Sequence, residues 1–154
     1  MLKDGDQAPQ IQLQTDADEP FDLDGVRGKK VVLFFYPRAS TPGCTVEACE
    51  FRDTFKKFEK KGVVVLGISK DSPAAQTRFK ENQGLPFTLL CDEDKKVADA
   101  YGVWKEKNMY GKKVEGIART TFVIGPDGKI KHIFNNVKAE GHAEEVLKYL
   151  KSAA

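Results

Sequence analysis

The sequence predicts an α/β domain with a mixed central sheet and helices on both faces of that sheet. Two continuous apolar runs, Val31–Tyr36 and Val63–Ile68, have the β-branched and aromatic content of strands that are buried on both faces. An amphipathic stretch separates these runs, and a hairpin pattern follows nearer the C-terminus. Because 154 residues with 40% hydrophobic content suffice for one core, we expect a single domain over residues 1–154.

The stretch before the first core strand is polar and rich in turn residues up to Gly28. Short alternating segments lie within it at Ile11–Leu13 and Phe21–Leu23. We expect this N-terminal extension to form an edge hairpin or an arm beside the core.

The core itself begins with a strand, a helix and a second strand. Pro37 ends the strand Val31–Tyr36, and Val63–Ser69 is the second buried strand. Between them, apolar residues recur at spacings of three and four from Cys44 until Gly62, which predicts an amphipathic helix. The buried face of this helix is expected to contain Ala48, Phe51, Phe55 and Phe58.

A second helix and an inserted segment follow. Ser72 and Pro73 provide an N-cap and a first-turn proline for a helix that runs to about Asn82. The insertion consists of a short extended piece at Leu85–Leu90 and a short helix at Lys95–Tyr101. The inward-facing residues of that helix are expected to be Val97, Ala100 and Tyr101. A polar, lysine-rich loop is expected next, containing Trp104, Met109 and Tyr110.

The C-terminal part reads as a hairpin and a final helix. Thr121–Ile124 and Ile130–Phe134 flank the turn residues Gly125–Gly128, which predicts two antiparallel strands. The stretch Glu140–Lys151 is predicted to be helical. Its apolar side consists of Ala143, Val146, Leu147 and Leu150.

This order of elements determines the topology that we expect. Strands joined through helices become parallel neighbours with right-handed crossovers, whereas the terminal hairpin is antiparallel. The result is a thioredoxin-like fold with an N-terminal extension and one insertion. Such a fold does not by itself identify a function.

Composition and charge exclude several classes of protein. Lys and Arg number 25 against 23 Asp and Glu, so the net charge of +2 is far from the basic excess of a nucleic-acid-binding protein. The lysine pairs Lys56-Lys57, Lys60-Lys61 and Lys112-Lys113 are interleaved with acids and predict solvated faces. Because the apolar runs are far shorter than the roughly 20 residues of a membrane helix, we expect no membrane partner.

The N-terminus and the cysteine count bear on compartment and chemistry. Residues 1–6 contain no apolar stretch ahead of a small-residue cleavage site, so we expect a cytoplasmic protein. The chain has three cysteines, which cannot all form pairs, and the expected compartment is reducing. That count disfavours a structural disulfide framework and indicates thiol chemistry.

Cys44 lies where such chemistry is favoured. The segment from Pro37 to Cys49 connects the first central strand to its helix, and Cys44 falls in the first turn of that helix. Unpaired backbone N–H groups and the positive end of the helix dipole favour a thiolate there. The alternative is that Cys44 is merely a small buried residue.

The residues Pro37, Thr41 and Cys44, in the pattern P-x-x-x-T-x-x-C, resemble the active-site signature of the peroxiredoxins. Cys49, five positions after Cys44, is similar to the second cysteine of the bacterioferritin comigratory, or Q-type, subgroup. The resemblance covers nearly the whole chain, from residues 5–9 to Arg119 and Phe122. Residues 38–40, Arg-Ala-Ser, differ from the Lys-Asp that often follows the proline in this subgroup, which affects the specificity of the site's rim.

This resemblance implies a thiol-dependent peroxidase that reduces hydrogen peroxide and organic hydroperoxides. It implies Cys44 as the peroxidatic nucleophile, Thr41 and Arg119 as its polar partners, Pro37 as a shield over the thiolate, and Cys49 as the resolving thiol. The sulfenic acid would be resolved through an intramolecular Cys44–Cys49 disulfide. The implied reductant is thioredoxin or a glutaredoxin-type dithiol, with no cofactor, no metal ion and often a monomeric chain.

Physical chemistry is compatible with these roles. Cleavage of an O–O bond needs an aligned nucleophile and donors directed at the oxygen that gains negative charge. Arg119 supplies fixed charge and forked donors, and Thr41 can accept and donate a hydrogen bond. The alternative for Arg119 is a surface salt bridge. Glu47 either orients Arg119 or simply lies favourably near the helix N-terminus.

The spacing of Cys44 and Cys49 has a geometric consequence. In an intact helix their Cα atoms lie roughly 8 to 9 Å apart, whereas a disulfide needs about 4.4 to 6.8 Å. Resolution by Cys49 therefore requires local unwinding of the helix. Cys49 could instead be an inert core thiol, which is also our expectation for Cys91.

Three other functions are weaker interpretations. A disulfide reductase of this fold would have C-x-x-C and a proline at the start of the third core strand, where this chain has Arg119. A cysteine hydrolase would need a histidine base, but His132 and His142 fall in the hairpin and near the last helix. A zinc module lacks paired, closely spaced ligands.

Overall fold

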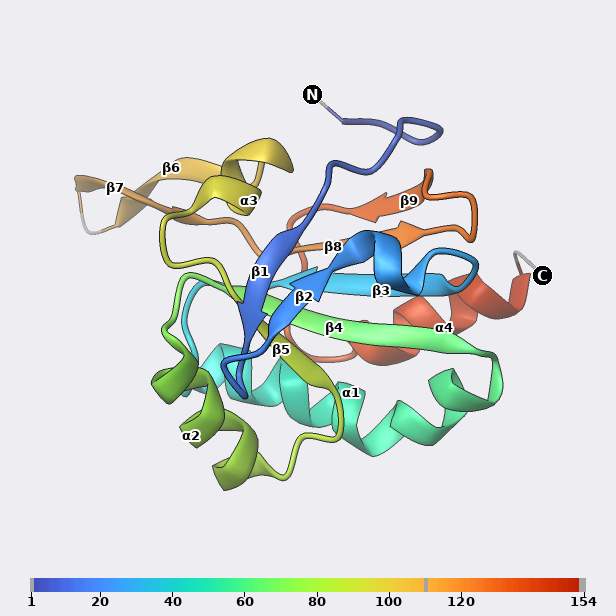
Figure 1. The fold of residues 1–154 in the computed structure, drawn as a ribbon. Helices are drawn as coiled ribbons and strands as arrows, with labels where there is room; N and C mark the ends of the chain where they lie inside the picture. The colour runs from blue at the N-terminus through green and yellow to red at the C-terminus, as the bar shows by residue number, and fades with distance from the viewer. Residues whose placement is uncertain (1, 110, 153–154) are drawn as a thin grey trace.

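The computed structural model describes residues 2–109 and 111–152, which form a seven-stranded mixed sheet with helices on both faces (Figure 1). The strand order is β2-β1-β5-β4-β3-β8-β9, and a separate two-stranded sheet consists of β6 and β7. Strands β3, β4 and β5 are parallel, whereas β1, β8 and β9 run antiparallel to their neighbours. The predicted mixed sheet is therefore confirmed.

The strands of the large sheet are β1 (Gln12–Thr15), β2 (Pro20–Asp22), β3 (Lys30–Phe35), β4 (Val63–Ser69), β5 (Thr88–Cys91), β8 (Thr120–Ile124) and β9 (Ile130–Phe134). The helices are α1 (Pro42–Lys60), α2 (Pro73–Gln83), α3 (Lys96–Ala100) and α4 (His142–Ser152), and a 3₁₀ turn spans Leu23–Val26. The N-terminal extension is the edge hairpin β1–β2, as the alternating segments predict.

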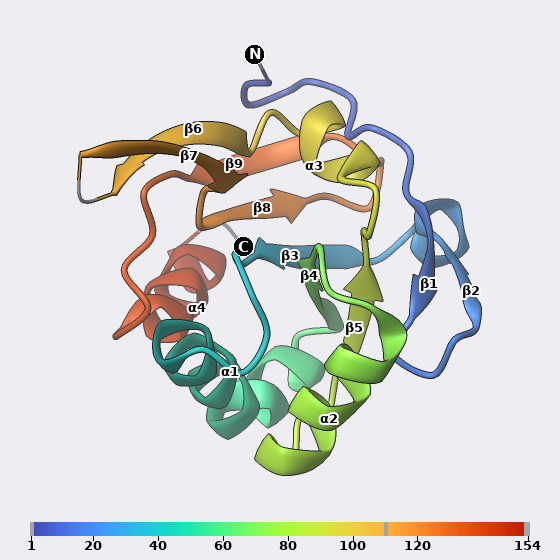
Figure 2. The same ribbon diagram turned by 90° about the vertical axis from the view of Figure 1, so that its left-hand side faces the viewer.

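Alternation along β3 divides the core into two layers. Val32, Phe34 and Tyr36 pack against α1, α2 and α4 on one face, whereas Val31, Leu33 and Phe35 pack on the other. Figure 2 shows α1, α2 and α4 together below the sheet, with α3 and the β6–β7 hairpin above it. Because both faces are covered, every residue of β3 after its first is buried, as the continuous apolar run predicts.

Two expectations for the inserted segment are wrong. The lysine-rich stretch is a hairpin of β6 (Trp104–Met109) and β7 (Lys112–Ile117) rather than a loop; Tyr110 lies outside the described residues. Half of the residues in each strand are charged, and this hides the alternation of apolar and polar residues expected of a strand. In α3, Ala98 is buried and Ala100 is exposed, whereas Val97 and Tyr101 are buried as expected. Positions 97, 98 and 101 lie on one face of a helical turn, and position 100 lies away from that face.

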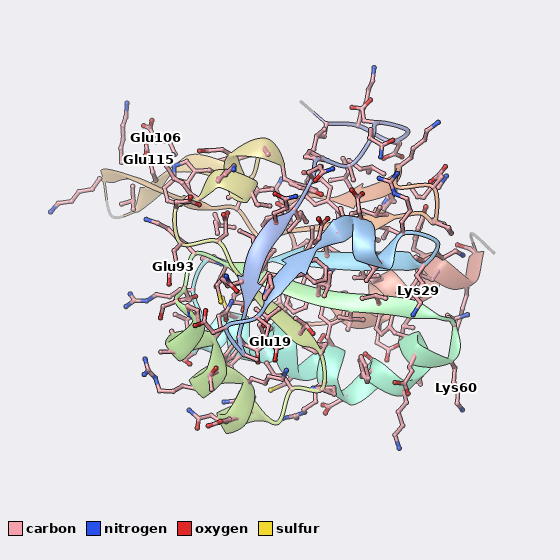
Figure 3. The ribbon with its side chains drawn as sticks, viewed as in Figure 1. Glu19, Lys29, Lys60, Glu93, Glu106 and Glu115 are labelled. Atoms are coloured by element: carbon pink, nitrogen blue, oxygen red, sulfur yellow. The ribbon has the colours of Figure 1, made fainter. Side chains whose placement is uncertain are left out.

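Acidic and basic side chains project from several different helices, strands and loops of the surface (Figure 3). The labelled residues include Glu106 and Glu115 on the β6–β7 hairpin and Lys60 at the end of α1, and all three are exposed. The three lysine pairs identified in the sequence are exposed as well. Among the described helices, none combines the length and apolar content needed to cross a membrane.

Gly67 in β4 provides a test of how tightly the core is packed. A Cβ atom at this position would lie 2.8 Å from Leu89 Cδ2 and 2.9 Å from Phe34 Cζ. We therefore expect Gly67→Ala to lower the free energy of unfolding by about 1–3 kcal/mol, the usual range for overpacking, in urea denaturation. Gly116→Ala is the matched control, since a Cβ at Gly116 in β7 meets nothing within 4 Å. Equal stability of the two variants would contradict the prediction.

Candidate active site

The site lies where β3 ends and α1 begins, at the C-terminal edge of the parallel strands. Thr41 is the N-cap residue of α1 and Pro42 occupies the first turn. Thr41 does not cap the helix with its side chain; its hydroxyl donates instead to the carbonyl oxygen of Arg38, at 2.8 Å. The first N–H groups of α1 have no partner within the helix, so they remain suited to an anionic or partly charged oxygen.

Cys44 occupies this first turn and is 1% exposed. Arg119 Nη2 donates to Cys44 Sγ at 3.4 Å. Arg119 is close because it immediately precedes β8, whose first residue Thr120 pairs with Phe35 at the end of β3. The sheet register therefore brings together two residues that are 75 positions apart in the chain.

Glu47, one turn after Cys44, binds the other arm of the same guanidinium. Arg119 Nη1 donates to Glu47 Oε1 at 2.7 Å, and the side chains of these two residues are 17% and 1% exposed. Arg119 is thus part of a largely buried ion pair rather than a surface salt bridge, and Glu47 contacts it directly. Gly43 leaves room for this guanidinium, since a Cβ there would lie 3.1 Å from Arg119 Nη2.

Burial controls the charge of this pair. Burial raises the pKa of Glu47 from 4.5 to about 7, and the attraction of Arg119 opposes that rise only in part. Among the described residues, none donates a hydrogen bond to Glu47 Oε2, which is also buried. Burial by itself lowers the pKa of Arg119, but its contacts with Glu47 and Cys44 together raise it above its ordinary value. The guanidinium consequently keeps its charge beside the sulfur.

Cys49 also lies on α1, which is continuous from Pro42 to Lys60. All three cysteines are free thiols. Cys49 is half-buried, and its Sγ donates to Gln83 Oε1 in α2 at 3.4 Å. The intact helix separates Cys49 from Cys44, as the spacing predicts.

The remaining residues named from the sequence have distinct environments. Pro37 is half-buried directly after Tyr36 and begins the loop to α1. Burial raises the pKa of Cys91 to about 12, which agrees with the expectation of an inert thiol. His142 is buried and hydrogen-bonds to Thr121 and Glu145, whereas His132 lies near Asp4. These histidine contacts give no support to a Cys–His hydrolase.

The described residues also contain no group of three or more His, Cys, Asp and Glu side chains arranged to hold a metal ion. A zinc module built on Cys44 and Cys49 therefore has no ligand set in this part of the chain.

The sequence interpretation missed a polar network beside the site. Ser69, Asp71 and Gln76 connect by hydrogen bonds to Tyr36 and to the backbone of Ala39. Ser69 and Asp71 follow the apolar run of β4 at the same sheet edge as Pro37. Polar residues at the carboxyl end of a buried parallel strand were the available signal.

Comparison with known proteins gives matches over most of the chain. The AhpC/TSA family matches residues 5–133. Peroxiredoxin Bcp of Escherichia coli strain K12 is 47% identical over 153 residues, covering 99% of this chain and 98% of that protein.

Two solved structures are similar over nearly the full chain. A PrxQ variant from Xylella fastidiosa has a TM-score of 0.94 at 37% identity, covering 99% of this chain and 98% of that one. A bacterioferritin comigratory protein from Xanthomonas campestris, which has alkyl peroxide reduction activity, gives 0.88 at 39% identity, with coverages of 93% and 91%. The expected thioredoxin-like fold is confirmed.

The raised pKa of Glu47 predicts a specific pH dependence of stability. Between pH 4.5 and about 7, the folded chain binds more protons at Glu47 than the unfolded chain does. Ionisation of Glu47 therefore lowers the free energy of unfolding as pH rises. Since Glu47→Gln cannot ionise, we expect its stability relative to wild type to increase by about 2 kcal/mol between about pH 5 and pH 8.

Urea denaturation of both proteins across this range is the measurement. Burial lowers the pKa of His142, which gives stability the opposite pH dependence, but that contribution is common to both proteins and cancels in the difference. A constant difference across the range would show that Glu47 is ionised throughout.

Proposed function

This chain belongs to the AhpC/TSA family, as a peroxiredoxin of the bacterioferritin comigratory, or Q-type, subgroup, and we propose that it reduces peroxides with the thiolate of Cys44 as the nucleophile. The observation that carries the proposal is the partly buried Arg119 guanidinium, which lies 3.4 Å from a sulfur in the first turn of a helix. A fixed cation and the helix N-terminus both stabilise negative charge on that sulfur.

The first step is attack of Cys44 Sγ on one peroxide oxygen. The O–O bond breaks, the leaving oxygen takes its electron pair and a proton, and water or an alcohol departs. Cys44 is oxidised to a sulfenic acid. The peroxide therefore accepts two electrons from a single sulfur.

Several groups around Cys44 are suited to this step. The Thr41 hydroxyl donates its hydrogen to Arg38, so its oxygen is free to accept a hydrogen bond from the peroxide. The N–H groups of the first helical turn and the Arg119 guanidinium are donors for the oxygen that gains charge. Pro37, at the start of the same loop, would limit access of water to the thiolate.

We propose both hydrogen peroxide and organic hydroperoxides as substrates. The Xanthomonas campestris relative, which is 39% identical to this chain, has alkyl peroxide reduction activity. The reacting part of any hydroperoxide is the same O–O–H group, so the residues around Cys44 can act on either class.

Resolution is proposed to use Cys49. Its thiolate attacks the sulfur of the sulfenic acid, an S–S bond forms, and the oxygen leaves as water. Because α1 is intact in the reduced chain, this step needs unwinding around Cys44 and Cys49. A dithiol such as thioredoxin or a glutaredoxin would then reduce the disulfide by exchange. Since both cysteines and the residues around them belong to one chain, a monomer would suffice for peroxide reduction and disulfide formation.

The peroxide step is tested with Cys44→Ser. We expect loss of peroxide reduction with an unchanged circular dichroism spectrum, because a serine hydroxyl is not ionised near neutral pH. Peroxide consumption is measured by stopped flow with thioredoxin, glutaredoxin or dithiothreitol as reductant. Cys91→Ser is the matched control and should retain the wild-type rate. Turnover by Cys44→Ser would contradict the assignment of the nucleophile.

The resolving step is tested with Cys49→Ser. This variant should reduce one equivalent of peroxide, fail to turn over with thioredoxin, and accumulate sulfinic acid, because its sulfenic acid lacks a partner. In oxidised wild type, we expect faster amide exchange across residues 44–53 and little change in β3 and β4.

Mass spectrometry of peroxide-treated wild type decides the identity of the resolving thiol. A Cys44–Cys49 linkage is the expected product. A Cys44–Cys91 linkage with Cys49 still free would show that the resolving residue is wrongly assigned.

A further inference from the structure

A chain of buried hydrogen bonds runs behind the loop that carries Thr41. The Tyr36 hydroxyl donates to Gln76 Oε1 at 2.5 Å. Gln76 Nε2 donates to Ser69 Oγ at 3.0 Å and to the carbonyl oxygen of Leu90 at 2.9 Å. Ser69 Oγ then donates to Asp71 Oδ2 at 2.6 Å. The chain thus connects β3, α2, β5 and the end of β4.

The last acceptor of this chain also binds the active-site loop. Asp71 Oδ2 accepts a hydrogen bond from the backbone N–H of Ala39, at 2.7 Å. Tyr36, Ser69 and Gln76 are each no more than 1% exposed, so their polar atoms depend on one another for partners. The position of Asp71 is consequently determined by buried groups on its inner side.

The loop needs such a restraint because its backbone is strained. Ser40 has a φ of 65°, in the left-handed region that residues with a Cβ atom rarely adopt. Strained residues of this kind persist where the surrounding structure fixes them. Ala39, the residue just before Ser40, is the one bound by Asp71.

The same loop determines where Thr41 lies. The Thr41 hydroxyl bonds to the Arg38 carbonyl, and the N–H of Thr45 bonds to the Thr41 carbonyl. The Ala39 N–H is therefore held inside the short turn that connects Arg38 to Thr41. Movement of Ala39 would displace both the Thr41 hydroxyl and the beginning of α1.

We propose that Asp71 is a positioning residue for peroxide reduction: its bond to Ala39 fixes the strained loop so that Thr41 and the first N–H groups of α1 are aligned with the peroxide. This inference rests on the proposed peroxidase function. It assigns to Asp71 an effect on alignment rather than on the sulfur's charge.

The hydrogen-bond directions predict which substitution is tolerated. Ser69 and Ala39 both donate to Asp71, and both bonds end on Oδ2. The carbonyl oxygen of an asparagine can accept the same two bonds, whereas an alanine accepts neither. Asp71→Asn should therefore preserve the loop and Asp71→Ala should release it.

The test compares two reactions of Cys44 in wild type, Asp71→Asn and Asp71→Ala. One is the second-order rate constant for hydrogen peroxide with the reduced chain, by stopped flow. The other is alkylation of Cys44 by iodoacetamide, measured by peptide mass spectrometry, which needs a thiolate but no aligned donors. Asp99→Ala, which removes an exposed carboxylate on α3, is the matched control.

For Asp71→Ala we expect the peroxide rate constant to fall about 10- to 100-fold, on the scale of a roughly 1 Å misplacement. Its alkylation rate should stay within about threefold of wild type, and the Ala39 amide should exchange faster. Asp71→Asn should stay close to wild type in all three measurements. If Asp71→Ala does not fold, Asp71→Ser replaces it, because the shorter hydroxyl cannot reach the Ala39 N–H.

Three results would overturn the proposal. These are a wild-type peroxide rate in Asp71→Ala, an equal fall in peroxide and alkylation rates, or an Asp71→Asn variant as slow as Asp71→Ala. The peroxide reaction of the wild-type protein tests the peroxidase function separately from the role of Asp71. Absence of a peroxide reaction in wild type refutes the peroxidase function, whereas a difference among the variants bears on Asp71 alone.

Discussion

The contact of Arg119 with both Cys44 and Glu47 is the interaction on which the rest of the site depends. It connects the first two turns of α1 to the residue just before β8, which pairs with β3. The guanidinium is charged at any physiological pH, so its effect on the sulfur is permanent. Glu47 is different, because burial raises its pKa to about 7 and its charge is only partly retained at neutral pH. Arg119 therefore exerts a constant electrostatic effect on Cys44. Its ion pair with Glu47, through which it is attached to the helix, is weak because Glu47 is only partly ionised.

A weak attachment suits the two conformations that the proposed cycle requires of α1. The peroxide step needs the first turn intact, since the helix N-terminus contributes to stabilising the sulfur. Disulfide formation between Cys44 and Cys49 needs the same turns to open. The polar side-chain contacts to be broken include those of Cys44 and Glu47 with Arg119, of Cys49 with Gln83, and of Glu50 with the N–H of Gly141 just before α4. Each of these contacts lies on α1 before Phe55, so the second half of the helix can remain packed.

The sequence predicts the sheet and the three long helices, because those features depend on hydrophobic period and on strand order. The pairing of Cys44 with Arg119 is expected from the family resemblance, and the contact of Glu47 with Arg119 is one of two alternatives. Cys44 and Arg119 are placed by the buried runs Val31–Tyr36 and Thr121–Ile124, both of which the sequence identifies as strands, but their antiparallel pairing is seen only in the structure. The β6–β7 ribbon is missed because its strands carry few apolar residues. The network ending at Asp71 is missed for another reason: the two bonds at its ends join residues 40 and 32 positions apart, and one of the donors is a backbone N–H. The polar residues after the apolar run of β4 indicate this sheet edge, but they do not specify which backbone N–H is bound.

In the proposed cycle, Phe51 would limit how far the opening of α1 extends. Its ring stacks on Phe34 of β3 with centroids 4.6 Å apart, and it also contacts Phe58 and His142. Exposing a side chain of this size costs about 2–3 kcal/mol, more than the net loss of one hydrogen bond. Cys49 lies two residues before Phe51, so the sulfur can leave the helix before the ring must leave the core. The opening with the lowest free-energy cost is one that unwinds residues 44–49 and keeps Phe51 stacked on Phe34. The position of this aromatic residue, more than helix propensity, would then set the boundary between the mobile turns and the permanent part of α1.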